Sequence, residues 1–141
     1  MRTMRTALAA VLLVAVAACG ESAEAGVEKA FRGYYAALLA RDFSTACSYN
    51  SPEAIDKLVL SLRTQGIAAS GCEDAYAAVF AEEGGSAAAD RIGNTVQIQG
   101  ITVNGDQATV NWSAELDGEQ RPSTSVMRRV DGQWRFVIES T

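Results

Sequence analysis

The sequence predicts an α+β domain in which N-terminal helices pack on a curved four-stranded antiparallel sheet. Apolar residues recur with helical spacing between residues 27 and 80, and the period falls to two after Asn94. The second half also contains three dipeptides typical of β-hairpin turns, which are Asn104-Gly105, Asp117-Gly118 and Asp131-Gly132. Helices followed by a run of strands favour a layer of helices on one sheet.

Two helices are expected before residue 50. The first covers residues 27–39, and one face of it is apolar: Val27, Ala30, Phe31, Tyr34, Tyr35 and Leu38. It stops near Asp42, whose side chain can cap a second, short helix that runs to Tyr49.

Further helices are expected between residues 51 and 85. Ser51 followed by Pro52 is typical of a helix start, because the hydroxyl caps the helix and proline lacks an N–H that the first turn does not need. Gly66 ends this helix. The run Ser70-Gly71-Cys72-Glu73 indicates a capping box that opens another helix, which Gly84-Gly85 closes.

The four strands follow from the alternation after Asn94. Between residues 108 and 116 apolar side chains alternate with polar ones, so one face of that strand is expected to be buried and the other wet. The first strand shifts its phase at Gly100, which is how a β-bulge appears in a sequence. A bulge bends the sheet, so the sheet is expected to be curved.

Composition excludes several classes of function. The 141 residues include no histidine, which removes Ser-His and Cys-His nucleophile pairs and the common His-ligated zinc sites. A formal net charge of −5 argues against nucleic-acid binding, which needs a basic surface. The acidic pairs Glu73-Asp74 and Glu82-Glu83 lack the spacing of a calcium loop, so no metal or other cofactor is expected.

The N-terminal segment has the features of a signal peptide. Arg2 and Arg5 precede an unbroken run of 12 apolar residues, 7–18. A membrane-spanning helix needs about 20 apolar residues, whereas this order of a basic start and a short apolar core is typical of a secretory signal. Residues 1–18 are therefore expected to be removed.

The end of this run, Val16-Ala17-Ala18-Cys19, resembles the lipobox of bacterial lipoproteins. The resemblance implies that the chain is cut before Cys19, that Cys19 carries acyl chains such as palmitate, and that they hold the protein at the extracytoplasmic face of the cell membrane. Residues 19–26 would be the lipidated cysteine and a tether, and residues 27–141 a single α+β domain. Simple secretion after Ala18 is the alternative.

Once Cys19 is assigned to lipid, Cys47 and Cys72 remain as a pair. Because thiols outside the cytoplasm persist as disulfides, we expect the two to be bonded. Two free buried thiols and a redox pair are the competing interpretations. A redox pair usually has Cys-x-x-Cys spacing, which is not found here.

Three stretches together resemble the nuclear transport factor 2-like superfamily: residues 34–43, 103–110 and 129–136. The resemblance implies a cone-shaped α+β fold, and a cystatin-like arrangement is the alternative.

The composition also indicates a type of source. Abundant Arg, Ala and Gly are the usage bias of a GC-rich genome, such as that of an actinobacterium.

In the cone-shaped fold the sheet can leave a pocket beside the first helix. The candidates to line it are Tyr34, Tyr35, Tyr76, Trp112 and Trp134; core packing is the competing interpretation of these aromatic residues. The isomerases of the superfamily use an acid beside a tyrosine. Asp42 is better explained as a helix cap, and Asp90 and Glu115 are expected in a loop and on a wet strand face, so no catalytic residue is assigned.

The sequence therefore predicts a lipid-anchored, non-enzymatic envelope protein that binds a small apolar ligand or a partner protein. A hydro-lyase or isomerase of the same fold and a structural docking module of envelope machinery are the alternatives. The lipid on Cys19 is the expected membrane contact, and an exposed sheet face could support a dimer.

Overall fold

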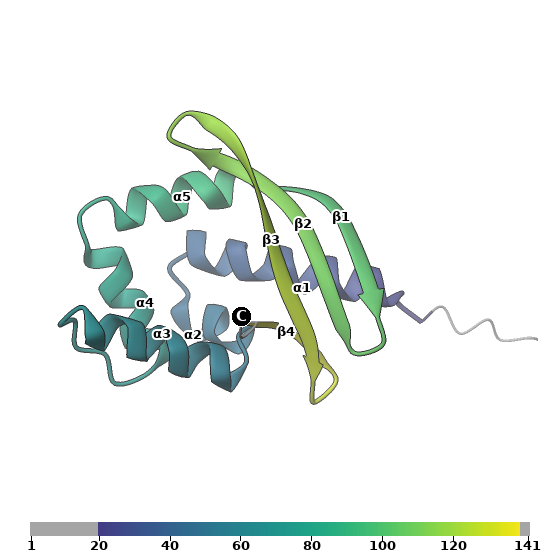
Figure 1. Ribbon diagram of the computed structural model, residues 1–141, viewed down its shortest axis with the longest axis horizontal. Helices are drawn as coiled ribbons and strands as arrows, with labels where there is room; N and C mark the ends of the chain where they lie inside the picture. The colour runs from purple at the N-terminus through teal and green to yellow at the C-terminus, as the bar shows by residue number, and fades with distance from the viewer. Residues whose placement is uncertain (1–19, 139–141) are drawn as a thin grey trace, which may run out of the picture.

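Figure 1 shows the computed structural model of the chain, which describes residues 20–138. The predicted signal peptide and Cys19 lie outside the described residues. Helices come first and strands second along this part of the chain. The elements are α1 (Ala23–Leu39), α2 (Phe43–Ser48), α3 (Pro52–Thr64), α4 (Cys72–Ala81), α5 (Gly85–Thr95), β1 (Gln97–Asn104), β2 (Gln107–Leu116), β3 (Glu119–Val130) and β4 (Gln133–Val137).

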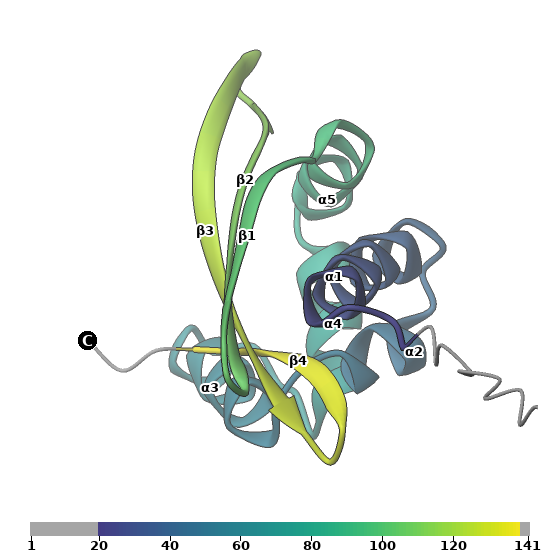
Figure 2. The same cartoon turned by 90° about the vertical axis from the view of Figure 1, so that its right-hand side faces the viewer.

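The strands form one antiparallel sheet in the order β1-β2-β3-β4. The register of β1 on β2 shifts between Ile98 and Gly100, so the predicted bulge is present. Asp117-Gly118 and Asp131-Gly132 have positive φ at both residues, as a two-residue hairpin turn of type I′ requires. The sheet bends around α1 (Figure 2). The predicted α+β fold of helices on a curved four-stranded sheet is therefore confirmed.

The main core lies between α1 and the sheet. Phe31 and Val27 of α1 are completely buried there, and so are Val110 of β2 and Met127 of β3. Two smaller apolar clusters lie among the helices: one joins α1, α2 and α4, and the other joins α3 and α4. The helical half therefore depends on two modest clusters that are separate from the sheet.

The first helix begins earlier than the sequence predicted. Ser22 caps it, accepting a hydrogen bond from the Ala25 N–H at 3.1 Å, and Glu24 lies in the first turn, where a carboxylate is favourable. Residues 23–26 thus belong to α1 and not to the tether proposed for residues 19–26. Gly26 packs against the Trp134 ring, so this turn is part of the folded domain.

Two helix starts were predicted correctly and one was shifted. Asp42 caps α2 and Ser51 caps α3, each by accepting a backbone N–H. The predicted capping box at residues 70–73 is wrong. Gly71 is the N-cap of α4, and Asp74 reaches back to the hydroxyl and N–H of Ser70. The acid that contacts Ser70 is therefore Asp74, one residue after the Glu73 of the predicted capping box.

Helix α5 was not predicted, and Asp90, expected in a loop, lies within it. This helix starts after Gly84, which has φ of 80°, has no side-chain cap and contains no fully buried residue. It packs against β2, α1 and α4, and Arg41 ties it to the end of α1. The Arg41 guanidinium donates to both oxygens of Asp90 at 2.7 and 2.9 Å and to Ser86 at 2.6 Å, and it lies over the Phe80 ring.

Gly33 provides a test of how closely α1 and α2 pack. A Cβ at this position would lie 2.7 Å from Cζ of Tyr49, a ring that cannot move without disturbing the core. Helix propensity alone favours alanine by about 1 kcal/mol, but overpacking costs about 1–3 kcal/mol. We expect Gly33→Ala to lower the free energy of unfolding, measured by urea denaturation, and the added change Tyr49→Phe to restore part of it. A more stable Gly33→Ala variant would contradict this packing.

Candidate ligand site

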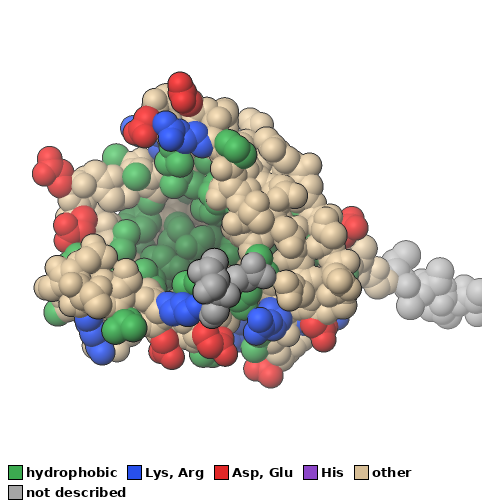
Figure 3. All heavy atoms as spheres, in the orientation of Figure 1, with side chains coloured by type: hydrophobic (Ala, Val, Ile, Leu, Met, Phe, Trp, Pro, Cys, Tyr) green, Lys and Arg blue, Asp and Glu red, His purple; other side chains and the backbone are tan. Residues whose placement is uncertain are grey.

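A hollow of about 310 Å³ opens between α1, α3, α4 and the end of the sheet. In the space-filling view hydrophobic side chains line a depression that faces the viewer (Figure 3). Its apolar lining includes Ile55 and Leu58 of α3 and Phe136 of β4. Its polar lining consists of five uncharged side chains: Tyr34, Tyr35, Asn50, Tyr76 and Ser125. We call this site the tyrosine hollow.

Consecutive tyrosines of α1 face the hollow because they lie one turn after Phe31. Residues three and four apart share a helix face, so burial of Phe31 against the sheet brings Tyr34 and Tyr35 to the same side. The Tyr34 ring lies 4.7 Å from that of Phe136, and the Tyr35 ring lies 5.8 Å from that of Trp112. These aromatic contacts fix both rings against the sheet.

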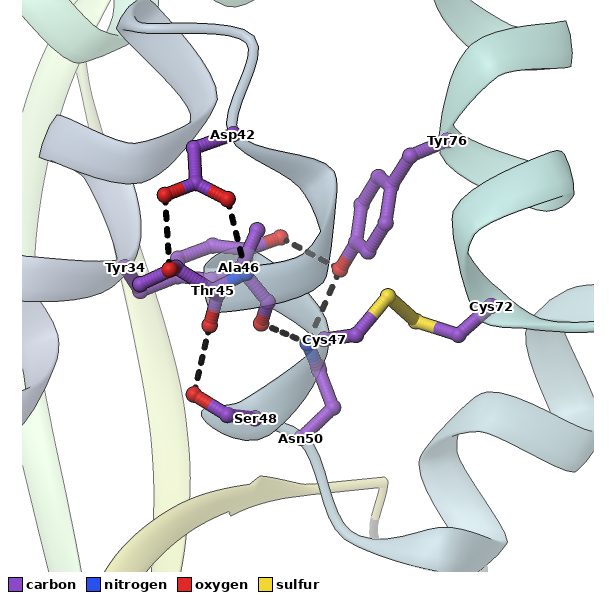
Figure 4. Close-up of a disulfide and its surroundings, with 9 residues drawn as sticks. All are labelled: Tyr34, Asp42, Thr45, Ala46, Cys47, Ser48, Asn50, Cys72 and Tyr76. Atoms are coloured by element: carbon purple, nitrogen blue, oxygen red, sulfur yellow. Dashed lines mark hydrogen bonds between the residues drawn. A yellow bond between two sulfur atoms is a disulfide. The ribbon is translucent and has the colours of Figure 1, made fainter.

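A chain of hydrogen bonds crosses the floor of the hollow (Figure 4). The Asn50 side-chain amide donates to the Tyr76 hydroxyl at 3.0 Å and to the Ala46 carbonyl at 2.9 Å. The hydroxyls of Tyr76 and Tyr34 lie 3.0 Å apart, and either can be the donor. Three elements, α1, α4 and the segment after α2, are therefore tied together at this point.

The predicted disulfide between Cys47 and Cys72 is present and lies beside this chain (Figure 4). It links the last turn of α2 to the first turn of α4. Asn50 follows Cys47 by three residues, and Tyr76 follows Cys72 by four, one helical turn further along α4. The bond thus holds together the two segments that carry Asn50 and Tyr76.

Burial keeps the tyrosines of the hollow in their neutral form. Desolvation raises the pKa of Tyr34 well above the ordinary value, with a further contribution from the charge of Tyr76. Desolvation also raises the pKa of Tyr35 and of Tyr76. Since no Asp, Glu, Lys or Arg is among the described residues that line the hollow, its polar groups are uncharged at physiological pH.

The two tryptophans of the predicted pocket lie elsewhere. Trp134 lines a separate groove of about 380 Å³ together with Lys29 and Gln133, and Arg129 lies over its ring. Trp112 contacts the rings of Phe31 and Tyr35, and its indole N–H donates to Ser125 at 2.9 Å. Of the five predicted lining residues, the structure therefore brings only the three tyrosines to the hollow.

Two polar lining residues were missed, Asn50 and Ser125. Each is a single polar residue in an ordinary position, one before a helix cap and the other within a strand, so no spacing or motif distinguishes it. Asn50 is placed by a backbone bridge to Phe136, which brings the start of α3 against β4. Only this long-range contact reveals its role.

The acids considered from the sequence have other roles. Asp42 accepts hydrogen bonds from the N–H and hydroxyl of Thr45, which lower its pKa. The hydrogen bonds from Arg41 lower the pKa of Asp90. Glu115 lies on β2, and its N–H donates to Thr95. Within residues 20–138 no group of three or more Cys, Asp or Glu side chains could hold a metal ion.

No family model and no curated protein matches the sequence. Among solved structures the chain is similar to a Campylobacter jejuni protein described as "Putative NTF2-like transpeptidase", with 19% identity and a TM-score of 0.47 over 79% of this chain and 97% of that one. Between residues 20 and 138, no helix has the length and apolar character needed to span a membrane.

The disulfide is expected to stabilise the domain strongly. Closing a 25-residue loop constrains the unfolded chain by about 3.5 kcal/mol in the loop-entropy account. The double substitution Cys47→Ala and Cys72→Ala should therefore lower the free energy of unfolding in urea by that order, and reduction of the unmodified protein should do the same. An unfolding midpoint that is insensitive to reduction would contradict this role.

The buried tyrosines also predict an alkaline transition. Because folding raises their pKa values, their contribution to stability is complete below about pH 10, where unfolded tyrosine begins to ionise, and is lost as the pH rises through the folded values. Phenolate absorbance from these residues should appear above pH 10, together with loss of the circular dichroism signal of the helices. Tyr35→Phe should remove part of the late absorbance. Complete titration near pH 10 with the fold intact would contradict the burial.

Proposed function

We propose that this protein is a lipid-anchored envelope protein whose exported domain binds a small, uncharged, largely apolar molecule in the tyrosine hollow. The observation that carries the proposal is the lining: aliphatic and aromatic side chains surround five neutral polar groups. A volume of about 310 Å³ is at the lower end of the range of about 300–1,000 Å³ typical of small-molecule sites.

The character of the lining favours a neutral ligand over an ion. A charged group that leaves water loses its hydration and needs an opposite charge in return. The described lining offers none, and the ammonium of Lys57 donates to the Ile138 carbonyl at 3.3 Å. An uncharged molecule loses little on entry and gains from burial of its apolar surface.

The same lining supports binding over the isomerase alternative. The described lining does contain tyrosine hydroxyls, which could polarise a substrate, but no carboxylate beside them to take a proton. Binding is therefore the function that the geometry supports best. The groove of Trp134 is a weaker candidate because Lys29, Ser48 and Gln133 make its lining more polar.

The anchor is supported by the sequence and by the start of α1. Removal of residues 1–18 takes two arginines from the chain and leaves a net charge of −7, which anionic lipid headgroups would repel. Acyl chains on Cys19 would then make the membrane contact. α1 begins at Ala23, at the end of the domain away from the hollow in Figures 1 and 3, so a lipid at Cys19 would leave the hollow open.

Mass spectrometry of the full chain, purified from the membranes of its own cells, tests both the lipid anchor and the bound ligand. The denatured protein should show the mass of residues 19–141 plus acyl groups, and Cys19→Ala should abolish incorporation of labelled palmitate. The native protein should carry an additional mass that is lost on denaturation, because the ligand is held by burial and hydrogen bonds.

Two leucines of α3 provide matched variants. Leu58 lines the hollow, whereas Leu60 is 61% exposed. Leu58→Trp should fill the hollow and remove the additional native mass, and Leu60→Trp should retain it. A ligand retained equally by both variants would place the binding site elsewhere. A native mass without ligand, together with a co-purified protein, would favour the docking alternative.

A further inference from the structure

The hydroxyl groups of the hollow donate fewer hydrogen bonds than they have protons. Asn50 uses both amide protons, on Ala46 and Tyr76. The contact between the Tyr34 and Tyr76 hydroxyls uses one of their two protons, whichever residue donates it. One phenolic proton of this pair is therefore left without an acceptor among the described residues.

Two further hydroxyls of the hollow, those of Ser125 and Tyr35, also have a proton without an acceptor among the described residues. Ser125 accepts a hydrogen bond from Trp112 at 2.9 Å, but its own proton is not donated to any described residue. The Tyr35 hydroxyl makes no hydrogen bond within residues 20–138, although its ring packs against Phe31 and Trp112. Three hydroxyl protons of the hollow therefore have no acceptor among the described residues.

From these hydroxyl protons we infer that the ligand carries a carbonyl-type oxygen that accepts hydrogen bonds from Tyr35 and Ser125. The ligand class is an uncharged, mainly apolar molecule with a ketone, ester or quinone carbonyl. This inference rests on the proposed function. A pure hydrocarbon would leave the hydroxyl protons unmet, which costs free energy in an apolar site.

Carboxylates are excluded by charge and not by hydrogen bonding. A carboxylate oxygen would accept the same hydrogen bonds, but no cation in the described lining would balance it. The raised pKa values of Tyr34, Tyr35 and Tyr76 mean that these groups stay protonated, and so remain donors, throughout the physiological range. A neutral carbonyl satisfies both the donors and the absence of charge.

Three naphthalene probes of nearly equal shape test the inference: 2-acetonaphthone, 2-isopropylnaphthalene and 2-naphthoate. Binding is measured by equilibrium dialysis against the full chain in lipid nanodiscs, with empty nanodiscs as background. Each added hydrogen bond is worth about fivefold in affinity. The ketone should bind at least fivefold more tightly than the hydrocarbon, and the carboxylate should bind most weakly.

Matched variants assign the preference to the named hydroxyls. Tyr35→Phe removes one donor from the hollow, and Tyr49→Phe removes a phenol that lines only the separate groove. Tyr35→Phe should reduce ketone binding about fivefold and leave hydrocarbon binding unchanged, Ser125→Ala should act in the same direction, and Tyr49→Phe should have no effect.

Other results would overturn either the carbonyl ligand alone or the proposed function as a whole. Equal binding of ketone and hydrocarbon, tightest binding of the carboxylate, or a ketone preference that survives both Tyr35→Phe and Ser125→Ala overturns the carbonyl ligand and leaves the hollow as an apolar binding site. Absence of saturable binding by all three probes overturns the proposed function together with this inference.

Discussion

Burial of Phe31 between α1 and the curved sheet determines where the rest of the site can lie. Its ring contacts Trp112 of β2 at 5.9 Å and Phe136 of β4 at 5.8 Å, so one side chain fixes the helix against two strands. With Phe31 fixed, helical geometry leaves Tyr34 and Tyr35 a single direction, toward the end of the sheet where β4 is short. The hollow is therefore a consequence of how α1 packs.

The wall of the hollow that α3 and α4 form is held by less apolar packing than the wall formed by α1 and the sheet. Helices α3 and α4 bury only small clusters, and a domain of this size has little apolar surface to spare. Two cross-links compensate for this. The Cys47–Cys72 disulfide holds α4 to α2, and Arg41 holds α5 beside the end of α1 through Asp90. The disulfide fixes the start of α4, which carries Tyr76, and the Arg41 pair adds to the packing of α5 on β2 and α1.

Local features could be predicted from the sequence, whereas most long-range contacts could not, and the Cys47–Cys72 disulfide is the exception. Turns at Asp117-Gly118 and Asp131-Gly132, the caps at Asp42 and Ser51 and the bulge at Gly100 each follow from neighbouring residues. Helix α5 was missed because none of its residues is fully buried and because it packs on β2 and α1, of which α1 lies far away in the sequence.

The residues of the candidate site also fall into those that the sequence predicted and those that it did not. Periodicity identified Tyr34, Tyr35 and Tyr76 as inward-facing. Trp134 was a candidate because of the pocket that the resembled fold can leave, and it is indeed buried, with 8% of its surface exposed. The resemblance does not give its position along the strand, and Trp134 lines the separate groove. Asn50 and Ser125 are single polar residues whose role appears only when distant segments meet.

The polar groups of the hollow are what packing alone does not explain. Phenylalanine at positions 34, 35 and 76 would fill nearly the same volume and would bury no hydroxyl. A hydroxyl without a protein partner donates to water in the free protein, and it loses that hydrogen bond when an apolar ligand displaces the water. Asn50 and Trp112 meet part of this cost by donating to Tyr76 and Ser125, which orients those two hydroxyls. The hydroxyl protons that remain face an apolar space, where a bound molecule with an acceptor oxygen can take their hydrogen bonds and a pure hydrocarbon cannot.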